Sequence, residues 1–373
     1  MKIEIQKTKI KKAIESAKKL FANSKKEILS KLQLETQDNK VLLISKDDKN
    51  ILEMKIECNV IEDGEVTLNY LKLEQILKEI KEKNIILETK NDNIIINNEF
   101  ELKKIKCKKI ENIKNDLQKN ILLDKNKFIE DLKKVSFCSS KKIEETNFFG
   151  VTLEINNFFN DIEYISCDSY RFAKISRKLN ELLKGINIED FKVIIPLNVV
   201  KCLEVLKTFD KEENIKINFD ENKSKIIFEF VNVTICSDIL SNNFLDFNTL
   251  LNQHLGEKTN KKTVFLDTDV FKEYLKEFLK VSRDVKNDFI LKFDFKENEL
   301  ILHPSKTEIF ETIKINYKEK ETKITLNLKF LLEFINLTDS KKIEINFFDK
   351  RNSVSLNIND DFKYLVMPMK STY

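Results

Sequence analysis

The sequence predicts an α+β fold made of three repeated domains, each with two units of a strand, a helix and further strands. Two strand–helix patterns alternate three times along the chain, and alternating strand hairpins follow both of them. A length of 373 residues suggests two to three domains. The repeated order favours three domains of about 115–140 residues. We place them at 1–118, 119–256 and 257–373.

The first pattern is an alternating apolar strand that ends at a polar residue and continues as a helix. It is found in IEIQKTKIKKAI (3–14), ILLDKNKFIEDL (121–132) and VFLDTDVFKEYL (264–275). Apolar residues then recur at i, i+4 and i+7, which indicates one buried helix face. The three stripes are Ile10, Ile14 and Ala17; Phe128, Leu132 and Val135; and Phe271, Leu275 and Phe278.

The second pattern is a short strand, a break at Asn or Pro, and a helix. It is found in VTLNYLKLEQILKEI (66–80), VIIPLNVVKCLEVLK (193–207) and ITLNLKFLLEFINLT (324–338). A run with a polar tip follows each copy, at 84–96, 214–228 and 342–356, and a similar run at 290–302 follows a copy of the first pattern. Alternation on both sides of a polar tip predicts hairpins.

Composition argues against several classes of protein. The four glycines are far apart, whereas phosphate-binding loops need clustered glycines. The six cysteines are single and the chain has two histidines, so we expect no metal and no cofactor. We also expect no signal peptide, no membrane span and free thiols in a reducing cytoplasm.

Three short motifs point to a known family: CDSYRFA (167–173), FLDF (244–247) and YLVMPMK (364–370). With the threefold repeat, they make the whole chain resemble the bacterial DNA sliding clamps, the beta subunits of DNA polymerase III. The resemblance implies a non-catalytic, head-to-tail homodimer that closes a ring around duplex DNA, with helices inside and antiparallel sheets outside. It also implies sequence-independent DNA binding. The expected partners are the replicative polymerase alpha subunit, the clamp loader, and other polymerases and repair proteins with short linear motifs.

The resemblance also carries site residues over to this chain, in three groups. The pocket for partner peptides would be walled by Phe148, Cys167, Tyr170, Arg171, Phe172, Leu250, Ser353, Leu365, Val366, Met367, Pro368 and Met369. The DNA-facing lysines would be Lys12, Lys19, Lys25, Lys26, Lys134, Lys141, Lys142 and Lys201. The dimer interface would use Phe100 and Leu102 on an edge strand in 99–109, with Leu279 and Val281 at a helix end as their counterpart.

The charge distribution agrees with helices that face DNA. The predicted helix windows 9–20, 72–83, 125–134, 199–207, 269–280 and 327–336 together carry +8, which leaves −4 for the rest of a chain whose total is +4. Lysines attract phosphates without regard to base sequence. Acids such as Glu15, Glu130, Asp131 and Glu204 interrupt the basic faces, which suits a ring that moves along DNA.

Two other classes of function stay open at this point. A repeat-built scaffold without a DNA role would have the same repeats, and a two-metal nuclease would need carboxylates such as Asp47–Asp48 or Asp360–Asp361. Both acidic pairs are predicted to lie in hairpin tips, where Asp shapes turns. His254 and His303 have no catalytic partner that the sequence identifies. The chain also departs from the family at Ser169–Tyr170, Leu245 and Lys370–Tyr373, which affects the expected shape of the pocket.

Overall fold

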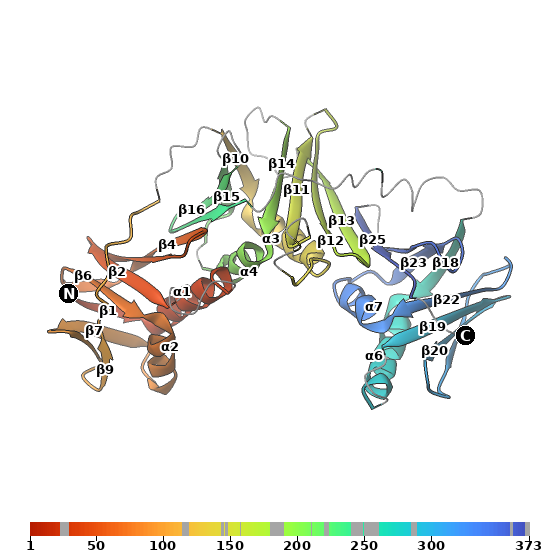
Figure 1. Ribbon diagram of the computed structural model, residues 1–373, viewed down its shortest axis with the longest axis horizontal. Helices are drawn as coiled ribbons and strands as arrows, with labels where there is room; N and C mark the ends of the chain where they lie inside the picture. Colours follow the sequence, from red (N-terminus) through yellow and green to blue (C-terminus); the bar gives the residue numbers. More distant parts are fainter. Residues whose placement is uncertain are drawn as a thin grey trace. The chain divides into compact units, whose positions relative to one another are not determined.

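The chain forms two compact units in the computed structural model (Figure 1). The structure describes residues 1–22, 30–113, 119–142, 145, 148–156, 158–179, 190–209, 211–219, 224–239, 249, 261–284, 289–358 and 361–369. The N-terminal unit comprises 1–133, 142–162 and 178–242, and the C-terminal unit comprises 134–141, 163–177 and 243–373.

The N-terminal unit contains two large antiparallel sheets. A five-stranded sheet has the order β5-β1-β7-β8-β9, and an eight-stranded sheet has the order β10-β15-β16-β17-β4-β3-β2-β6. Their strands are β1 Lys2–Gln6, β2 Lys31–Gln37, β3 Lys40–Lys46, β4 Asn50–Glu57, β5 Asn59–Glu62, β6 Glu65–Asn69, β7 Asn84–Lys90, β8 Asn93–Ile96, β9 Phe100–Lys103, β10 Lys119–Asp124, β15 Asn214–Phe219, β16 Lys225–Phe230 and β17 Val233–Asp238. In the same unit β11 Gly150–Asn156 pairs with β14 Phe191–Pro196. Its helices are α1 Lys7–Leu20, α2 Tyr70–Glu79, α4 Leu197–Leu206 and the first part of α3 Lys125–Ser136.

The C-terminal unit is smaller and also combines antiparallel strands with helices. One group of antiparallel strands has the order β13-β25-β24-β23-β18, and a four-stranded sheet has the order β21-β20-β19-β22. The strands are β13 Arg171–Lys178, β18 Lys262–Asp267, β19 Ile290–Lys296, β20 Glu299–Pro304, β21 Glu311–Lys314, β22 Thr322–Asn327, β23 Lys342–Phe347, β24 Val354–Asn357 and β25 Phe362–Val366, and most of β12 Asp161–Cys167 also belongs here. The helices are α6 Thr268–Asp284 and α7 Leu328–Ile335, which pack against each other.

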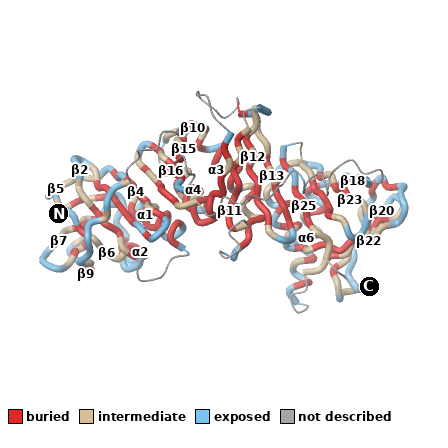
Figure 2. The backbone as a smooth tube through the Cα atoms, turned by 45° about the horizontal axis from the view of Figure 1, so that its top comes forward, coloured by how far each residue is buried: buried red, intermediate tan, exposed pale blue. Residues whose placement is uncertain are grey.

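The predicted apolar stripes form the cores. All nine stripe residues of the first pattern are at most 1% exposed. Figure 2 shows buried residues along most of the labelled strands. The predicted hairpins are also confirmed as β7–β8, β15–β16, β23–β24 and β19–β20.

The breaks predicted in the second pattern begin helices. Asn69 Oδ1 accepts hydrogen bonds from the N–H groups of the second and third residues after it, at 3.0 and 3.1 Å, and Asn327 does the same before α7. These bonds satisfy helix-terminal N–H groups that have no partner within the helix. In the middle copy the position is Pro196, whose side chain makes no such bond.

Asparagine shapes most of the tight turns in this glycine-poor chain. Asn91, Asn160 and Asn298 have φ of 49°, 55° and 59°, a region that Asn tolerates better than other residues with a side chain. Gly150 meets a different requirement at the start of β11. A Cβ there would lie 2.2 Å from the carbonyl oxygen of Ile195, so only glycine lets β14 approach.

The first two repeats join through paired strands inside the N-terminal unit. β17 pairs with β4, with Ser237 opposite Asn50. The next residue, Asp238, donates its N–H to the carbonyl of Lys49 at 2.9 Å. On the helical side, α1 packs against α4, and the Asn198 side chain donates to the Leu20 carbonyl at 2.5 Å.

The C-terminal unit contains a second joint with the same register. β25 pairs with β13, with Val366 opposite Arg171. Met367 then donates its N–H to the carbonyl of Tyr170 at 2.8 Å, as Asp238 does to Lys49 at the first joint. The two joints therefore use the same strands of the repeat. In the repeat, β9 is the equivalent of β17 and β25, and β21 is the equivalent of β4 and β13. Both β9 and β21 lie at the edges of their own sheets.

Candidate functional site

The segment 364–369 is half strand and half surface. Tyr364, Leu365 and Val366 are at most 3% exposed and belong to β25. Met367, Pro368 and Met369 follow the strand and are half-buried. They are held from both sides by backbone bonds, from Met367 to Tyr170 and from the Met369 N–H to the Thr325 carbonyl, both at 2.8 Å. We call Tyr170 and Met367–Met369 the C-terminal docking surface.

Arg171 anchors the floor beneath this surface. Its side chain is 4% exposed, its Nε lies 3.0 Å from Asp168 Oδ2, and its Nη1 pairs with Glu333 of α7. The guanidinium also lies over the ring of Phe330, 4.2 Å from its centroid. Burial alone would lower the pKa of Arg171, but the charges of its neighbours outweigh it and the pKa is raised. Arg171 is therefore a fixed cation.

Aromatic rings and thiols complete this floor. The ring of Tyr364 stacks on Phe334 at 4.6 Å and lies 5.4 Å from Phe137, and its hydroxyl donates to the Phe330 carbonyl at 3.2 Å. Burial, and then the charge of Asp168, raises the pKa of the Cys167 thiol to about 12. A neutral thiol of this kind is packing and not a nucleophile.

The structure separates the residues that resemblance assigns to the peptide pocket. Cys167, Arg171, Phe172, Ser353, Leu365 and Val366 are buried in the C-terminal unit, while Tyr170 is 64% exposed. Phe148 belongs to the N-terminal unit, and Leu250 lies outside the described residues. The sequence did not identify Glu333, Phe330 or Phe137. The indication available was Arg171, one of only four arginines in a lysine-rich chain, because a buried arginine requires an anionic partner.

The lysines assigned to DNA lie on helices and the residues that follow them. Lys12 and Lys19 are on α1, where Lys12 contacts Thr208, and Lys201 is exposed on α4. Lys134 is half-buried at the end of α3, Lys141 is exposed, and Lys142 pairs with Glu145 at 3.3 Å. Lys25 and Lys26 lie outside the described residues.

The residues assigned to the dimer interface lie on one edge strand and one helix end. Phe100 is half-buried on β9, whereas Leu102 is only 5% exposed because it packs within its own domain. Leu279 and Val281 are half-buried on α6. The structure adds two candidates for this interface, Ile309 and Phe310, which directly precede edge strand β21. Their side chains are 48% and 62% exposed. The sequence marks them as an apolar pair between two glutamates, outside any predicted element.

The acidic pairs and histidines are explained by turns and packing where the structure describes them. Asp47 Oδ1 accepts from the N–H groups of Lys49 and Asn50 at 2.9 and 2.6 Å, which confirms the turn interpretation of Asp47–Asp48. Asp361 pairs with Arg177, while Asp360 and His254 lie outside the described residues. His303 has a partner that the sequence did not identify, because its Nε2 lies 3.7 Å from Asp294 Oδ2.

The described part of the chain contains no group of three or more His, Cys, Asp or Glu side chains that could hold a metal ion. None of the helices described in the structure is long and apolar enough to cross a membrane.

Curated relatives of this chain are sliding clamps. The chain is 23% identical over 253 residues to the beta sliding clamp of Chlamydia trachomatis, an alignment that covers 66% of this chain and 56% of the relative. It is 24% identical over 252 residues to that of Borreliella burgdorferi, covering 64% and 62%. The chain thus matches less than two thirds of the length of these relatives.

Solved structures share the fold along the whole chain. The beta subunit of DNA polymerase III from Thermotoga maritima matches with a TM-score of 0.85 at 19% identity and 100% coverage of both chains. The Helicobacter pylori beta clamp bound to a DNA ligase peptide matches with a TM-score of 0.82 at 20% identity, covering 99% of this chain and 100% of that one.

Family models account for nearly all of the sequence. Residues 1–114 match the N-terminal domain of the DNA polymerase III beta subunit, residues 122–246 its central domain and residues 257–370 its C-terminal domain. The chain therefore belongs to the DNA polymerase III beta subunit family, the bacterial sliding clamps.

Proposed function

We propose that the protein is a non-catalytic, head-to-tail homodimeric ring that encircles duplex DNA and tethers the replicative polymerase for processive synthesis. The proposal rests on one observation above all. Within the chain, β17 pairs with β4 and β25 pairs with β13 in the same register. The equivalent strands β9 and β21 remain at sheet edges. Exposed edges invite pairing with another chain. Two copies arranged head to tail satisfy both edges of each copy and close the assembly.

The repeat gives the register of the proposed subunit joint. One position of the repeat is identified by a shared backbone hydrogen bond to the carbonyl of an asparagine at the tip of a preceding hairpin. The donors are the N–H groups of Leu179, Cys58 and Ile315, and the acceptors are the carbonyls of Asn160, Asn39 and Asn298. Eight residues earlier in the three copies lie Arg171, Asn50 and Thr307. Arg171 and Asn50 are the residues of the two joints within the chain, so Thr307, four residues before β21, is the equivalent residue for the joint with a second copy.

The opposite strand is aligned by a second shared bond. The Ile105 N–H donates to the Thr67 carbonyl as Met369 donates to Thr325, each at 2.8 Å. Leu102 therefore corresponds to Val366, and Leu102 would lie opposite Thr307 of the second copy. Since the strands are antiparallel, Phe100 would then lie opposite Ile309, which joins a half-buried ring to a half-exposed side chain.

The helical side of the joint follows from the same comparison. α1, α3 and α6 each begin with a backbone N–H that donates to the carbonyl of the residue directly before β7, β15 and β23 respectively, at 2.8, 2.8 and 3.0 Å. Val281 is then the equivalent of Leu20, and Leu71 of Asn198. Leu71 is 39% exposed on α2. The α6 end with Leu279 and Val281 would cover it in the second copy, as α1 packs on α4 within the chain.

The lysines support a path for DNA of moderate strength. Exposed Lys19 and Lys201 can meet phosphates, while acids on the same helices are partly engaged, as in the ion pair of Lys133 with Glu204 at 3.9 Å. Sequence-independent phosphate contacts of this kind weaken steeply with salt. A linked ring can remain on DNA without strong contacts.

The C-terminal docking surface suits short linear motifs of the polymerase alpha subunit, the clamp loader, other polymerases and repair proteins. Met367 and Met369 flank Pro368 on a backbone held at both ends. Methionine is flexible and polarizable, so it can repack around different apolar anchors. The Helicobacter pylori clamp, solved with a DNA ligase peptide, is a precedent for peptide binding in this fold. We place this activity in the cytoplasm, without a cofactor, and keep the domain limits 1–118, 119–256 and 257–373.

Retention on closed circular DNA tests the ring. After loading onto a nicked or gapped circle, the protein should stay bound at salt concentrations that abolish its binding to linear fragments, and should leave when the circle is cut. Electrostatic binders lose affinity by orders of magnitude over such a salt range. Equal loss from circles and linear fragments would exclude a topological link and favour the scaffold alternative.

A further inference from the structure

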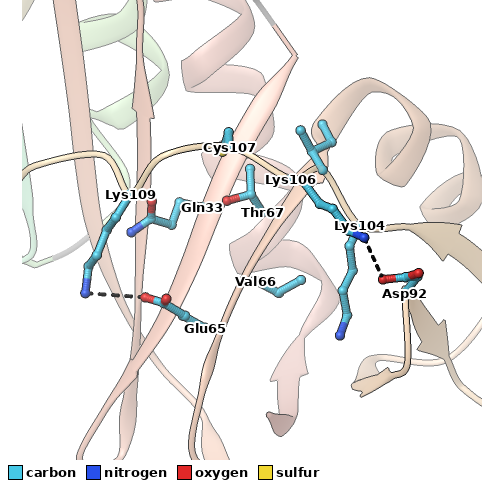
Figure 3. Close-up of a pocket in the computed structure, with 10 residues that line it drawn as sticks. Gln33, Glu65, Val66, Thr67, Asp92, Lys104, Lys106, Cys107 and Lys109 are labelled. Carbon is cyan, nitrogen blue, oxygen red and sulfur yellow. Dashed lines mark ion pairs between the residues drawn. The ribbon is translucent and has the colours of Figure 1, made fainter.

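A cavity of about 330 Å³ lies in the first domain, beneath the segment that follows β9 (Figure 3). All of its lining residues belong to the N-terminal unit. Ile105 holds the segment to β6 through the bond to Thr67, and Ile110 holds it to β2 by donating its N–H to Gln33 Oε1 at 2.8 Å. The volume is at the lower end of the range of ligand pockets. We call this cavity the domain-one groove.

The groove occupies the repeat position of the C-terminal docking surface. Because Ile105 corresponds to Met369, Lys103 and Lys104 correspond to Met367 and Pro368. The two segments share the bond to the neighbouring strand, but Lys103 and Lys104 are basic where Met367 and Pro368 are apolar. A ligand of the groove should therefore be extended, and its chemistry should be acidic.

Gln33 contributes a buried donor to the groove. The residue is 3% exposed, and its Oε1 is used by the Ile110 N–H, which leaves Nε2 as a donor. Nε2 has no hydrogen-bond acceptor among the described residues. A buried donor without an acceptor is unfavourable because it has lost its hydrogen bonds to water, and a ligand oxygen would restore one of them.

The backbone and the cations of the segment point to the same ligand. The N–H groups of residues 106–109 donate to no acceptor in the described part of the chain. Lys109 pairs with Glu35 and Glu65 at 2.8 and 3.4 Å and Lys106 pairs with Asp92 at 3.4 Å, whereas Lys104 makes no ion pair with a described residue. In Figure 3, Gln33 and Lys109 lie on one side of the groove and Lys104 on the other.

We propose that the domain-one groove binds a short extended acidic peptide of a partner protein. Its backbone carbonyls accept from alternate open N–H groups of residues 106–109, as in recognition by strand addition. One carboxylate meets Lys104 and another acceptor meets the Gln33 amide. This site is distinct from the C-terminal docking surface and does not require the ring, because the N-terminal unit supplies all of it.

Fluorescence anisotropy of the full-length protein tests the proposal. The probe is a fluorescein-labelled peptide of alternating leucine and glutamate, compared with one of alternating leucine and lysine. We expect the acidic probe to bind and the basic one not to bind. Lys104→Glu should weaken binding by about tenfold or more, because it replaces an attractive charge by a repulsive one. Lys108→Glu is the matched control, since Lys108 is exposed in the same segment but does not line the groove.

A second measurement follows a thiol in the wall of the groove. Cys107 is exposed and lines the cavity. The acidic probe should slow its alkylation by iodoacetamide, and Lys104→Glu should restore the rate. Deleting residues 367–373 should leave both results unchanged, so failure of the C-terminal docking surface and failure of this groove are distinguishable. Equal weakening by Lys104→Glu and Lys108→Glu, or no binding of the acidic probe at low salt, would overturn the proposal.

Discussion

An Ile309→Glu substitution tests the proposed subunit joint at its centre. In the single chain Ile309 is 48% exposed, so its replacement should not disturb the core of the third domain. In the proposed ring it lies opposite Phe100 of the second copy. Leu102 is a poorer probe than the sequence suggested, because its 5% exposure means that a charge there would destabilise the first domain itself.

The expected effect follows from the surface that remains open. Covering the exposed half of an isoleucine contributes about 1 kcal/mol, and a closed dimer has two joints, so the variant loses about 2 kcal/mol. Desolvating a glutamate at each joint adds at least about 1 kcal/mol. The total of about 4 kcal/mol corresponds to a dimer roughly 1,000-fold weaker.

Sedimentation equilibrium over a range of protein concentrations measures this change. The matched control is Val231→Glu, which places the same charge at a 66% exposed residue between β16 and β17, away from both edges. The control should remain dimeric, and both variants should unfold at nearly the same urea concentration. If Ile309→Glu dimerises as tightly as the control, the β9–β21 joint is wrong.

Four further predictions concern the C-terminal unit and the thiols. Deleting residues 367–373 should leave a dimer that is retained on circular DNA but no longer supports processive synthesis in a primer-extension assay; undiminished processivity would contradict the docking role. Arg171→Met should lower the free energy of unfolding by about 2 kcal/mol in urea titration, because it removes the charge-assisted hydrogen bonds of Arg171 to half-buried Asp168 and exposed Glu333. Burial lowers the pKa of His303 below 6.5, so the folded state binds a proton at His303 less readily than the unfolded state does. The contribution of neutral His303 to the free energy of unfolding should therefore be fully present above pH 6.5 and fall as the pH is lowered below it. His303→Gln should reduce this pH dependence of the urea midpoint. Iodoacetamide at pH 8 should modify exposed Cys107 well before Cys202, whose pKa burial raises; peptide mapping by mass spectrometry would detect the reverse order.

Much of the fold could be predicted from the sequence because its determinants are local. The spacing of Phe271, Leu275 and Phe278 places them on one helix face whatever surrounds the helix. Likewise, an asparagine between a strand and an apolar run can cap a helix with its own side chain, as Asn327 does. Alternation around a polar tip predicts a hairpin for the same reason.

Tertiary structure decided what depends on residues far apart in the chain. The sequence suggested that YLVMPMK both completes a strand and forms a binding surface. It could not divide the segment into buried Tyr364–Val366 and half-buried Met367–Met369, because burial depends on the neighbouring strand β13. It could not identify Glu333 as the partner of Arg171, since the two meet only when α7 packs near that strand.

The sequence by itself determined the repeat, the helix faces and the family, because periodicity and short motifs are properties of neighbouring residues. Only the tertiary structure decided which strand edges stay open and where a buried donor such as Gln33 faces a cavity. The pairing of β17 with β4 joins residues about 180 positions apart, and such contacts depend on the registers of whole sheets. For that reason the exposure of Ile309 and the presence of the domain-one groove follow from the folded structure and not from the sequence.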